Sequence, residues 1–499
     1  MSSACFSLVL LLAAEVVVLE CGLAKAANVY VAPNGTASGK GTERRPYDLA
    51  TALSGEVSRP GDTFWLREGI YHLGQAYTEI HGAPGRPVTF RAVPGERAQL
   101  IGSLTIGGQG YVIFRDFELS SGVEGRISRQ TGAGFSPTDL TNFVEGIQVG
   151  IPNVSFINLV VHDSVRSAFC TASEATNILI YGCIVYNTGW ASPDNAEGHS
   201  YYLQAAGEIS ENIGFNSTGA GFHVYANGAG DGVRNLALTG NVAWGAGALQ
   251  SVRSYRDWIV GVDSPGVTAD HISLQDNMGY VTTNTTTLTR VQLGRENING
   301  SLVLVSNYWP QGVTISNWSN AVVVGNTIAP QRPECAIDLQ ENLTNLRARW
   351  NSNYYIQASN DPLFRLGSKN YGFGAWKDIT GYDSSSSSST RPLQGTKIFV
   401  RPNRYEPGRA NIVVYNWDNL NTVTVNVRDV MPIGAAYEVR NVQDFFAEPV
   451  LRGVFNGELL RLPMNGLSTA RPMARMRTPP ATGPTFNVFV LLPRVNKNQ

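Results

Sequence analysis

Short apolar segments that alternate with polar positions recur along the first two thirds of the chain, each bounded by glycine or asparagine. An Asn or Cys precedes an apolar strand at Asn158, Cys183, Asn212, Asn241 and Asn277, which lie 25, 29, 29 and 36 residues apart. Strands of this length at such a repeat are typical of a parallel β-helix, whereas the blade of a β-propeller needs about forty residues or more. The pattern therefore predicts a parallel β-helix, in which each Asn amide bonds the matching backbone of the next coil.

The regular spacing ends after Ile328, and the last part of the chain has a different pattern. Residues 384–391 are rich in serine, as in a polar linker. Beyond them, polar and apolar residues alternate as in the strands of an antiparallel sheet. We therefore expect a signal peptide (1–26), a β-helix with an N-terminal cap (27–383), a Ser-rich linker (384–391) and a C-terminal antiparallel β domain (392–499).

The N-terminal segment has the features of a secretory signal. Residues 6–19 are apolar apart from Glu15, and residues 24–26 fit the small-x-small cleavage pattern. No other stretch is apolar over the length of a membrane span. We therefore expect a secreted or periplasmic protein. After cleavage, Cys170, Cys183 and Cys335 remain, an odd and sparse set that predicts no disulfide framework.

Aligning the repeats predicts which side chains lie in one outward row. Alternate residues of a strand point to opposite faces, so Ile147, Phe169, Tyr201 and Phe222 are expected in the interior. The outer row is then Gln148, Cys170, Tyr202 and His223, with Gln204 and Tyr225 in the row beside it. His199 comes from the loop before its strand to the same edge. Because histidine beside tyrosine is a frequent acid–base grouping, we predict a catalytic set of His223, Tyr202, His199 and Tyr225.

The first coils contain motifs of a known family. These are Tyr30-Val31-Ala32-Pro33 followed by Gly35, the element PYDLATA at 46–52, Pro60-Gly61-Asp62-Thr63, and Arg67-x-Gly69-x-Tyr71. Over residues 28–120, and more loosely through the repeats, the chain resembles secreted right-handed β-helix polysaccharide lyases of the chondroitinase-B and alginate-lyase family. The resemblance implies a right-handed β-helix and an acidic polysaccharide as substrate. That family's catalytic lysine cannot be carried over, because no lysine lies between Lys40 and Lys369.

β-Elimination from a uronate needs a group that neutralises the carboxylate, a base at C5 and an acid at the leaving O4. Without a lysine, we assign the base to a histidine and the acid to Tyr202 or Tyr225. The predicted substrate-binding residues are Gln204, Arg166, Arg253, Trp190 and Trp244.

Three other functions stay open. A glycoside hydrolase would use carboxylates among Asp194, Glu197, Glu208 and Asp231. A C5-epimerase would share the fold, although an Asp-Pro-His-Asp motif is missing, and a binding protein would use the solenoid without catalysis. No metal-binding spacing is diagnostic, so we expect no cofactor, with Ca²⁺ on carboxylates as the alternative. The formal net charge of −1 gives no footprint for nucleic acid, and we expect a monomer.

Overall fold

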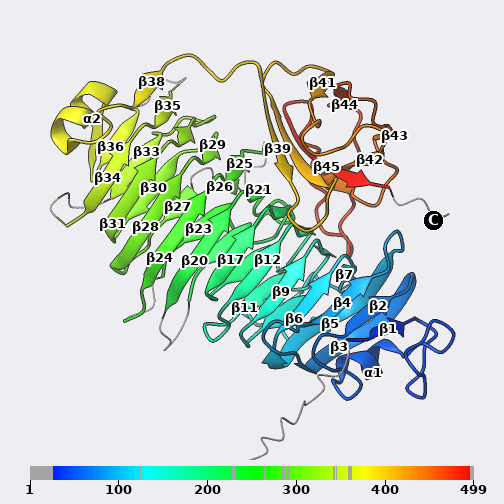
Figure 1. Ribbon diagram of the computed structural model, residues 1–499. Coiled ribbons are helices and arrows are strands. Elements are labelled where there is room, and N and C mark those ends of the chain that lie inside the picture. The colour runs from blue at the N-terminus through cyan, green and yellow to red at the C-terminus, as the bar shows by residue number, and fades with distance from the viewer. Residues whose placement is uncertain are drawn as a thin grey trace, which may run out of the picture.

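A computed structural model shows a long β-solenoid with a smaller β domain packed along one side (Figure 1). It describes residues 26–122, 125–226, 232–262, 266–282, 287–288, 291–340, 343, 345–357 and 362–494. All but the last residue of the predicted signal peptide, 1–26, lies outside this range. Strands of successive coils pair in parallel, and the C-terminal strands pair antiparallel. The predicted fold class is therefore confirmed.

Successive coils contribute strands to three parallel ladders that run along the solenoid, and we name these ladders the first, second and third faces; the second and third faces share β5 and belong to one sheet. The first face comprises β1 (Asn28–Val31), β2 (Thr63–Leu66), β4 (Val88–Ala92), β6 (Val112–Arg115), β9 (Val154–Ile157), β12 (Ile178–Tyr181), β17 (Gly207–Ser210), β20 (Val233–Thr239), β24 (Ala269–Gln275), β28 (Asn299–Val305), β31 (Trp318–Val324) and β34 (Arg347–Asn351). The second face comprises β3 (Gly69–His81), β5 (Ala98–Gly110), β7 (Glu118–Ser120), β10 (Val160–His162), β13 (Ile184–Tyr186), β18 (Ile213–Phe215), β21 (Val242–Trp244), β25 (Met278–Tyr280), β29 (Tyr308–Trp309), β32 (Thr327–Ile328), β35 (Tyr354–Ile356) and β38 (Ser387–Ser389). The third face starts at the second half of β5 and continues with β8 (Ile147–Val149), β11 (Phe169–Thr171), β16 (Tyr201–Leu203), β19 (Phe222–Val224), β23 (Trp258–Val260), β27 (Val291–Leu293), β30 (Val313–Ser316), β33 (Ile337–Gln340) and β36 (Phe364–Leu366).

Both ends of the solenoid are covered by a short helix. At the N-terminal end, α1 (Leu49–Leu53) buries its apolar residues, and its first turn is capped by Asp48, which accepts a hydrogen bond from the Thr51 N–H at 2.7 Å. At the other end, α2 (Phe373–Thr380) buries Trp376, whose ring stacks on Phe364 at 4.6 Å. These caps keep water from the open ends of the core.

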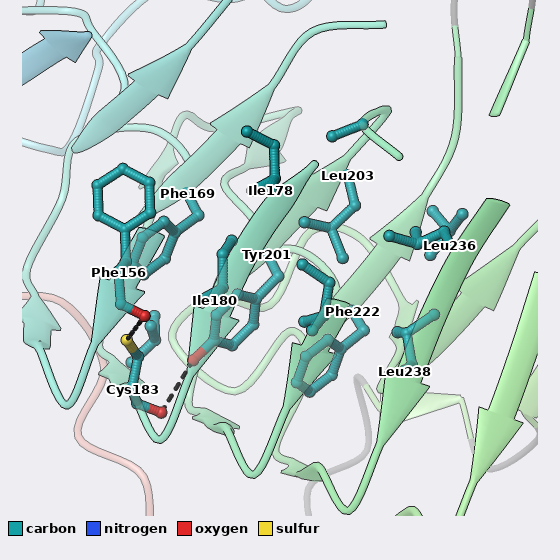
Figure 2. Packing of buried hydrophobic residues seen from close by; sticks show 14 of the residues in the cluster. Phe156, Phe169, Ile178, Ile180, Cys183, Tyr201, Leu203, Phe222, Leu236 and Leu238 are labelled. Atoms are coloured by element: carbon teal, nitrogen blue, oxygen red, sulfur yellow. Dashed lines mark hydrogen bonds between the residues drawn. The ribbon is translucent and has the colours of Figure 1, made fainter. Parts of the chain in front are cut away.

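Side chains of equivalent strands stack inside the solenoid. Phe169, Tyr201, Phe222 and Trp258 form a column on the third face, with successive ring centroids 5.5, 4.5 and 4.5 Å apart. Figure 2 shows part of this column beside Ile180 and Leu203, and the Tyr201 hydroxyl donating to the Cys183 carbonyl at 3.1 Å. Since one interior residue sets the position of the next, the outward side chains are also held in register.

A ladder of buried asparagines runs along the corner before the second face. Its members are Asn212, Asn241, Asn277, Asn307, Asn326 and Asn353. The Oδ1 atom of each of the last five accepts from both the backbone N–H and the side-chain amide of the preceding one, at 2.9 to 3.1 Å. The predicted ladder is confirmed, but Asn158 was aligned wrongly. Val160 pairs with Ile184, so Leu159 takes the ladder position, and Asn158, at φ 56°, forms the turn before it.

The ladder ends on a carboxylate rather than on another amide. Asp383 is fully buried and accepts from the Asn353 side chain at 3.1 Å, from the Trp376 indole at 2.9 Å and from the Tyr355 hydroxyl at 3.1 Å. The serine run that follows was predicted as a linker, 384–391. Part of it, Ser387–Ser389, instead forms β38 and pairs in parallel with β35 as the last strand of the second face. Serine can take this place because β38 is an edge strand that needs no apolar outer side.

The C-terminal domain packs on the second face (Figure 1). Its main sheet consists of β39 (Thr396–Pro402), β40 (Ala410–Asn416), β45 (Phe486–Pro493), β42 (Ala436–Asn441) and β43 (Leu451–Val454), and a second sheet pairs β41 (Thr422–Val425) with β44 (Leu460–Pro463). Outward residues of the second face, such as Phe215 and Trp244, share one buried cluster with residues of β40 and β45. The Trp244 ring lies 5.2 Å from that of Phe486. The domain therefore shields these outward side chains of the second face from solvent.

A buried charged network lies under the same contact. The ring nitrogens of His162 lie 2.8 Å from Asp163 and 3.0 Å from Glu118, and Asp163 also accepts from Arg126 at 2.7 Å and from the Met473 N–H at 2.8 Å. Burial alone would lower the pKa of His162, but the two carboxylates outweigh it and raise the pKa to about 9. The imidazolium form therefore belongs to the folded state at neutral pH, and it helps hold the C-terminal chain at residue 473.

Candidate active site

The third face carries the predicted outer row. Tyr202 pairs with Cys170 on one side and with His223 on the other, and Gln148 lies beyond Cys170. Their neighbours Ile147, Phe169, Tyr201 and Phe222 are fully buried in the interior. The predicted register is therefore confirmed at every one of these positions.

His199 lies two residues before β16, and its buried ring turns toward this row. Its ring centroid is 4.5 Å from that of His223 and 5.4 Å from that of Tyr202. Gly219 makes room for the ring, because a Cβ at that position would lie 2.6 Å from His199 Nδ1. The two histidines and Tyr202 thus form one cluster, as predicted.

A second ladder, which we name the edge ladder, fixes the orientation of His199. Glu145, Ser167, His199 and Ala220 each lie two residues before a strand of the third face. The backbone N–H of Ser167 donates to Glu145 Oε2 at 2.6 Å, that of His199 to Ser167 Oγ at 3.2 Å, and that of Ala220 to His199 Nδ1 at 2.8 Å. Each side chain therefore accepts a bond from the backbone of the next coil.

The edge ladder determines where the histidine protons lie. Since the Ala220 N–H donates to Nδ1, the neutral His199 carries its proton on Nε2. That Nε2 lies 3.2 Å from Nδ1 of His223 and donates to it. His223 must then carry its own proton on Nε2, an atom that has no hydrogen-bond partner among the described residues. The pair therefore ends in a buried N–H and not in a free lone pair.

Both histidines stay neutral at ordinary pH. Burial, with Arg166 and Arg253 nearby, lowers the pKa of His199 to about 3. Burial, together with His199 and Arg295, lowers the pKa of His223 well below its usual value. A neutral imidazole with a fixed N–H can polarise a developing oxyanion. This tautomer favours a donor role for His223, whereas the sequence predicted the role of a base.

The two predicted tyrosines complete the cluster. The Tyr225 ring stacks on His223 at 5.0 Å and lies 6.3 Å from that of Tyr202. Burial raises the pKa of Tyr202, and the nearby thiol of Cys170 adds to the rise. The Tyr202 hydroxyl consequently keeps its proton at neutral pH and can give it to a leaving oxygen.

Two partly buried carboxylates flank Arg166. Its Nη1 lies 3.1 Å from Glu145 and its Nη2 lies 3.9 Å from Glu197, which ends the hairpin of β14 (Trp190–Ala191) and β15 (Ala196–Glu197). Burial raises the pKa of both carboxyls, although Arg166 acts against it. Glu197 Oε2 has no hydrogen-bond partner among the described residues, and Oε1 lies 3.9 Å from His199 Nε2. A carboxylate in this setting is a candidate proton acceptor.

Arginines held on aromatic rings surround the cluster. Arg166 lies over Phe143 at 5.1 Å, and Arg295 over Tyr225 at 5.4 Å. Arg253 lies over Tyr255 (Tyr255–Arg256 form β22) at 5.3 Å and donates to the Asn195 side chain at 2.9 Å. A cavity of about 290 Å³ has Glu145 in its wall, but its lining includes neither the two histidines nor the tyrosines of the cluster. The site therefore offers several cations, and the cavity lies beside it on the side of Glu145.

Sequence reasoning missed Glu145 and Arg295. The signal for Glu145 was available, because it aligns with His199 when the repeats are extended two residues before each strand. Arg295 follows β27, beyond the segments that were aligned. Gln204 lies in register with Tyr225, beside the cluster.

Other predicted residues do not present their side chains to the site. Trp190 and Trp244 are fully buried, so neither presents a face to a sugar. Trp244 faces the C-terminal domain, which a repeat pattern does not reveal. Of the carboxylates considered for a hydrolase, Asp194 accepts from Ser192 in its own loop and from the Gly132 N–H. Glu208 pairs with Arg404, and Asp231 lies outside the described residues.

Within the described part of the chain, His, Cys, Asp and Glu side chains form no group of three or more that could hold a metal ion. In the same residues, no helix is long and apolar enough to cross a membrane. The prediction of no cofactor, with Ca²⁺ as the alternative, stays a prediction.

No family model and no curated protein matches this chain. Among solved structures it is similar to a pectate lyase (13% identity, 66% of this chain and 80% of that chain covered, TM-score 0.40). It is also similar to the A-module of a mannuronan C-5 epimerase from Azotobacter vinelandii (15%, 67% and 89%, 0.40) and to a mannuronic-acid-specific family 6 polysaccharide lyase from human gut microbiota (13%, 74% and 78%, 0.37). These sequence identities and TM-scores are too low to transfer an activity or a residue role from those proteins to this chain.

Proposed function

We propose that this chain is an exported carbohydrate-active enzyme that cleaves a uronate-containing polysaccharide by β-elimination on the third face. The observation that carries the proposal is the N–H of His223, whose direction is fixed through His199. The ring of the protonated Tyr202 lies 5.3 Å from that of His223, and the partly buried carboxylate of Glu197 lies 3.9 Å from His199 Nε2. The arginines around this cluster supply the positive charge that a uronate carboxylate needs.

In this proposal each group has one role. Arg166 and Arg253 hold the uronate carboxylate, and the His223 N–H donates to the oxygen that gains charge as C5 loses its proton. Glu197 takes that proton. The C5–H electron pair forms the C4=C5 bond, the C4–O4 bond breaks, and O4 takes the proton of Tyr202. The phenolate then recovers a proton from water or from Glu197, which closes the cycle.

A glycoside hydrolase is the second candidate. Glu145 and Glu197, both with a raised pKa, lie on the two sides of Arg166. A pair of carboxyls in which one keeps its proton is the requirement for acid-catalysed cleavage of a glycosidic bond. Elimination is favoured because the His223 and Tyr202 protons and the arginines have no assigned use in hydrolysis.

A panel of polysaccharides tests the reaction class. Polygalacturonate, polymannuronate, polyguluronate and chondroitin are incubated with the protein, with uncharged xylan as control. Ultraviolet absorbance of a C4–C5 double bond together with new reducing ends means elimination. New reducing ends without that absorbance mean hydrolysis, and neither signal on any polymer would contradict both enzyme proposals.

Variants then test the roles on the polymer that reacts. Because glutamine keeps an N–H donor, His223→Gln should retain about a tenth of the activity or more, whereas His223→Ala should lose about 10²–10³-fold. Glu197→Gln should lose at least about 10²-fold, and the matched control Glu208→Gln, paired to Arg404 on the first face, should stay active. If His223→Gln is as inactive as His223→Ala while Glu197→Gln is active, His223 is the base and this assignment is wrong.

A further inference from the structure

A cavity of about 750 Å³ lies between the early coils of the solenoid and the C-terminal domain, apart from the third face. Residues 91–98, from the end of β4 to the start of β5, form one wall, and residues of β42 and the end of β45 form part of the other. The arginines in its lining are Arg91, Arg97, Arg409, Arg440 and Arg494. Two domains thus bring together basic residues that are hundreds of positions apart in the chain.

The lining of this cavity contains as many carboxylates as arginines. The five carboxylates are Glu96, Asp116, Glu118, Glu406 and Glu438. All the lining arginines except Arg494 form an ion pair with one of these carboxylates, and Arg67, Arg115 and His162 contact the same carboxylates from outside the lining. A bound anion would therefore be stabilised by the guanidinium N–H groups that these carboxylates leave unpaired.

Arg409 is the most buried of the lining arginines, at 6% exposed. Its Nη1 donates to Glu406 at 3.2 Å, but its Nε and Nη2 have no hydrogen-bond partner among the described residues. The Nε of Arg91 also has no hydrogen-bond partner among the described residues, although its Nη2 donates to Asp116 at 2.8 Å. Buried guanidinium N–H groups are normally paired, so an oxyanion in this cavity would supply the acceptors that the chain lacks.

Size and apolar lining point beyond an inorganic ion. The volume is in the range of pockets that enclose organic ligands, and Phe117, Val160 and Leu492 form part of its wall. We propose that this cavity is a second binding site, for a short anionic saccharide whose carboxylate or sulfate group meets the arginines. A polysaccharide would then bind at the boundary between the solenoid and the C-terminal domain, independently of any reaction on the third face.

Calorimetric titration of the full chain tests this site. The probes are trigalacturonate, uncharged maltotriose and sodium sulfate, and the host protein carries Arg166→Gln so that binding on the third face is weakened. Two cavity variants are compared in this host: Arg97→Gln with Arg494→Gln, both at exposed positions, and Arg409→Lys, which keeps the charge but loses the planar fork. The control is Arg401→Lys, which pairs with Glu211 across the same domain boundary outside the cavity.

Trigalacturonate should bind the host with a stoichiometry of one, and each cavity variant should weaken it by about tenfold or more, with no change in the control. Maltotriose should not bind. Three results would overturn the proposal: no binding of trigalacturonate to the host, equal binding of maltotriose, or binding unaffected by both cavity variants. Binding of sulfate alone would mean an inorganic anion site and would overturn the saccharide assignment.

Discussion

Replacing Asn277 by alanine tests the asparagine ladder quantitatively. Its Oδ1 accepts from the Asn241 N–H and side-chain amide, both at 3.0 Å, and its Nδ2 donates to the Leu238 carbonyl at 2.9 Å and to Asn307 at 3.1 Å. A buried hydrogen bond contributes about 1 kcal/mol net. Loss of four such bonds should therefore lower the local free energy of unfolding by about 4 kcal/mol, before any cost of the cavity that remains.

Hydrogen exchange followed by mass spectrometry measures this change where it occurs. A solenoid is stabilised mainly between neighbouring coils, so a global unfolding free energy would average over distant coils. At about 1.4 kcal/mol for each factor of ten, amides of β21 and β25 should exchange about 10³-fold faster in Asn277→Ala. Exchange in β1 and β2 should stay as in the natural protein.

Asn320→Ala is the matched control, because Asn320 is exposed on the first face. A substitution of this kind changes stability by about 0.5 kcal/mol or less. If exchange in β21 and β25 rises less than tenfold in Asn277→Ala, or rises equally in Asn320→Ala, the ladder is not a main source of stability and the reasoning fails.

Three further predictions concern other parts of the chain. The pKa of His162 is about 9 in the folded protein and near 6.5 in the unfolded chain, so protonation of His162 contributes roughly 3 kcal/mol to the free energy of unfolding. That contribution is complete below about pH 6.5 and is lost as pH rises through 9; the melting temperature should follow this course, and His162→Gln should remove it. A chain ending at residue 391 should self-associate in gel filtration, since it exposes Phe215 and Trp244; a monodisperse monomer would contradict this. Gly219→Ala should reduce turnover by about tenfold or more through displacement of His199 while the circular dichroism spectrum is kept, and full activity would show that the ring can shift without harm.

The fold and the outer row were predictable because one period governs both. Alternation along each strand and equal steps between coils placed Tyr202 beside His223 from sequence alone. The same reasoning failed for Trp244, since its outward position is covered by a domain outside the repeats. It failed for Asn158, because asparagine also occurs in the turn one position before the ladder, where the backbone has a positive φ. The sequence does not distinguish a turn asparagine from a ladder asparagine.

The role of His223 was beyond sequence for a different reason. Whether an imidazole acts as donor or base depends on which nitrogen carries the proton, and here that follows from the Ala220 N–H through His199. The edge ladder and the asparagine ladder are the same device, a side chain that accepts from the backbone of the next coil. In the corner this device stabilises the stack. At the third face a histidine takes the accepting place, so the regular backbone of the solenoid fixes the direction of a hydrogen-bonded pair that ends at the candidate site.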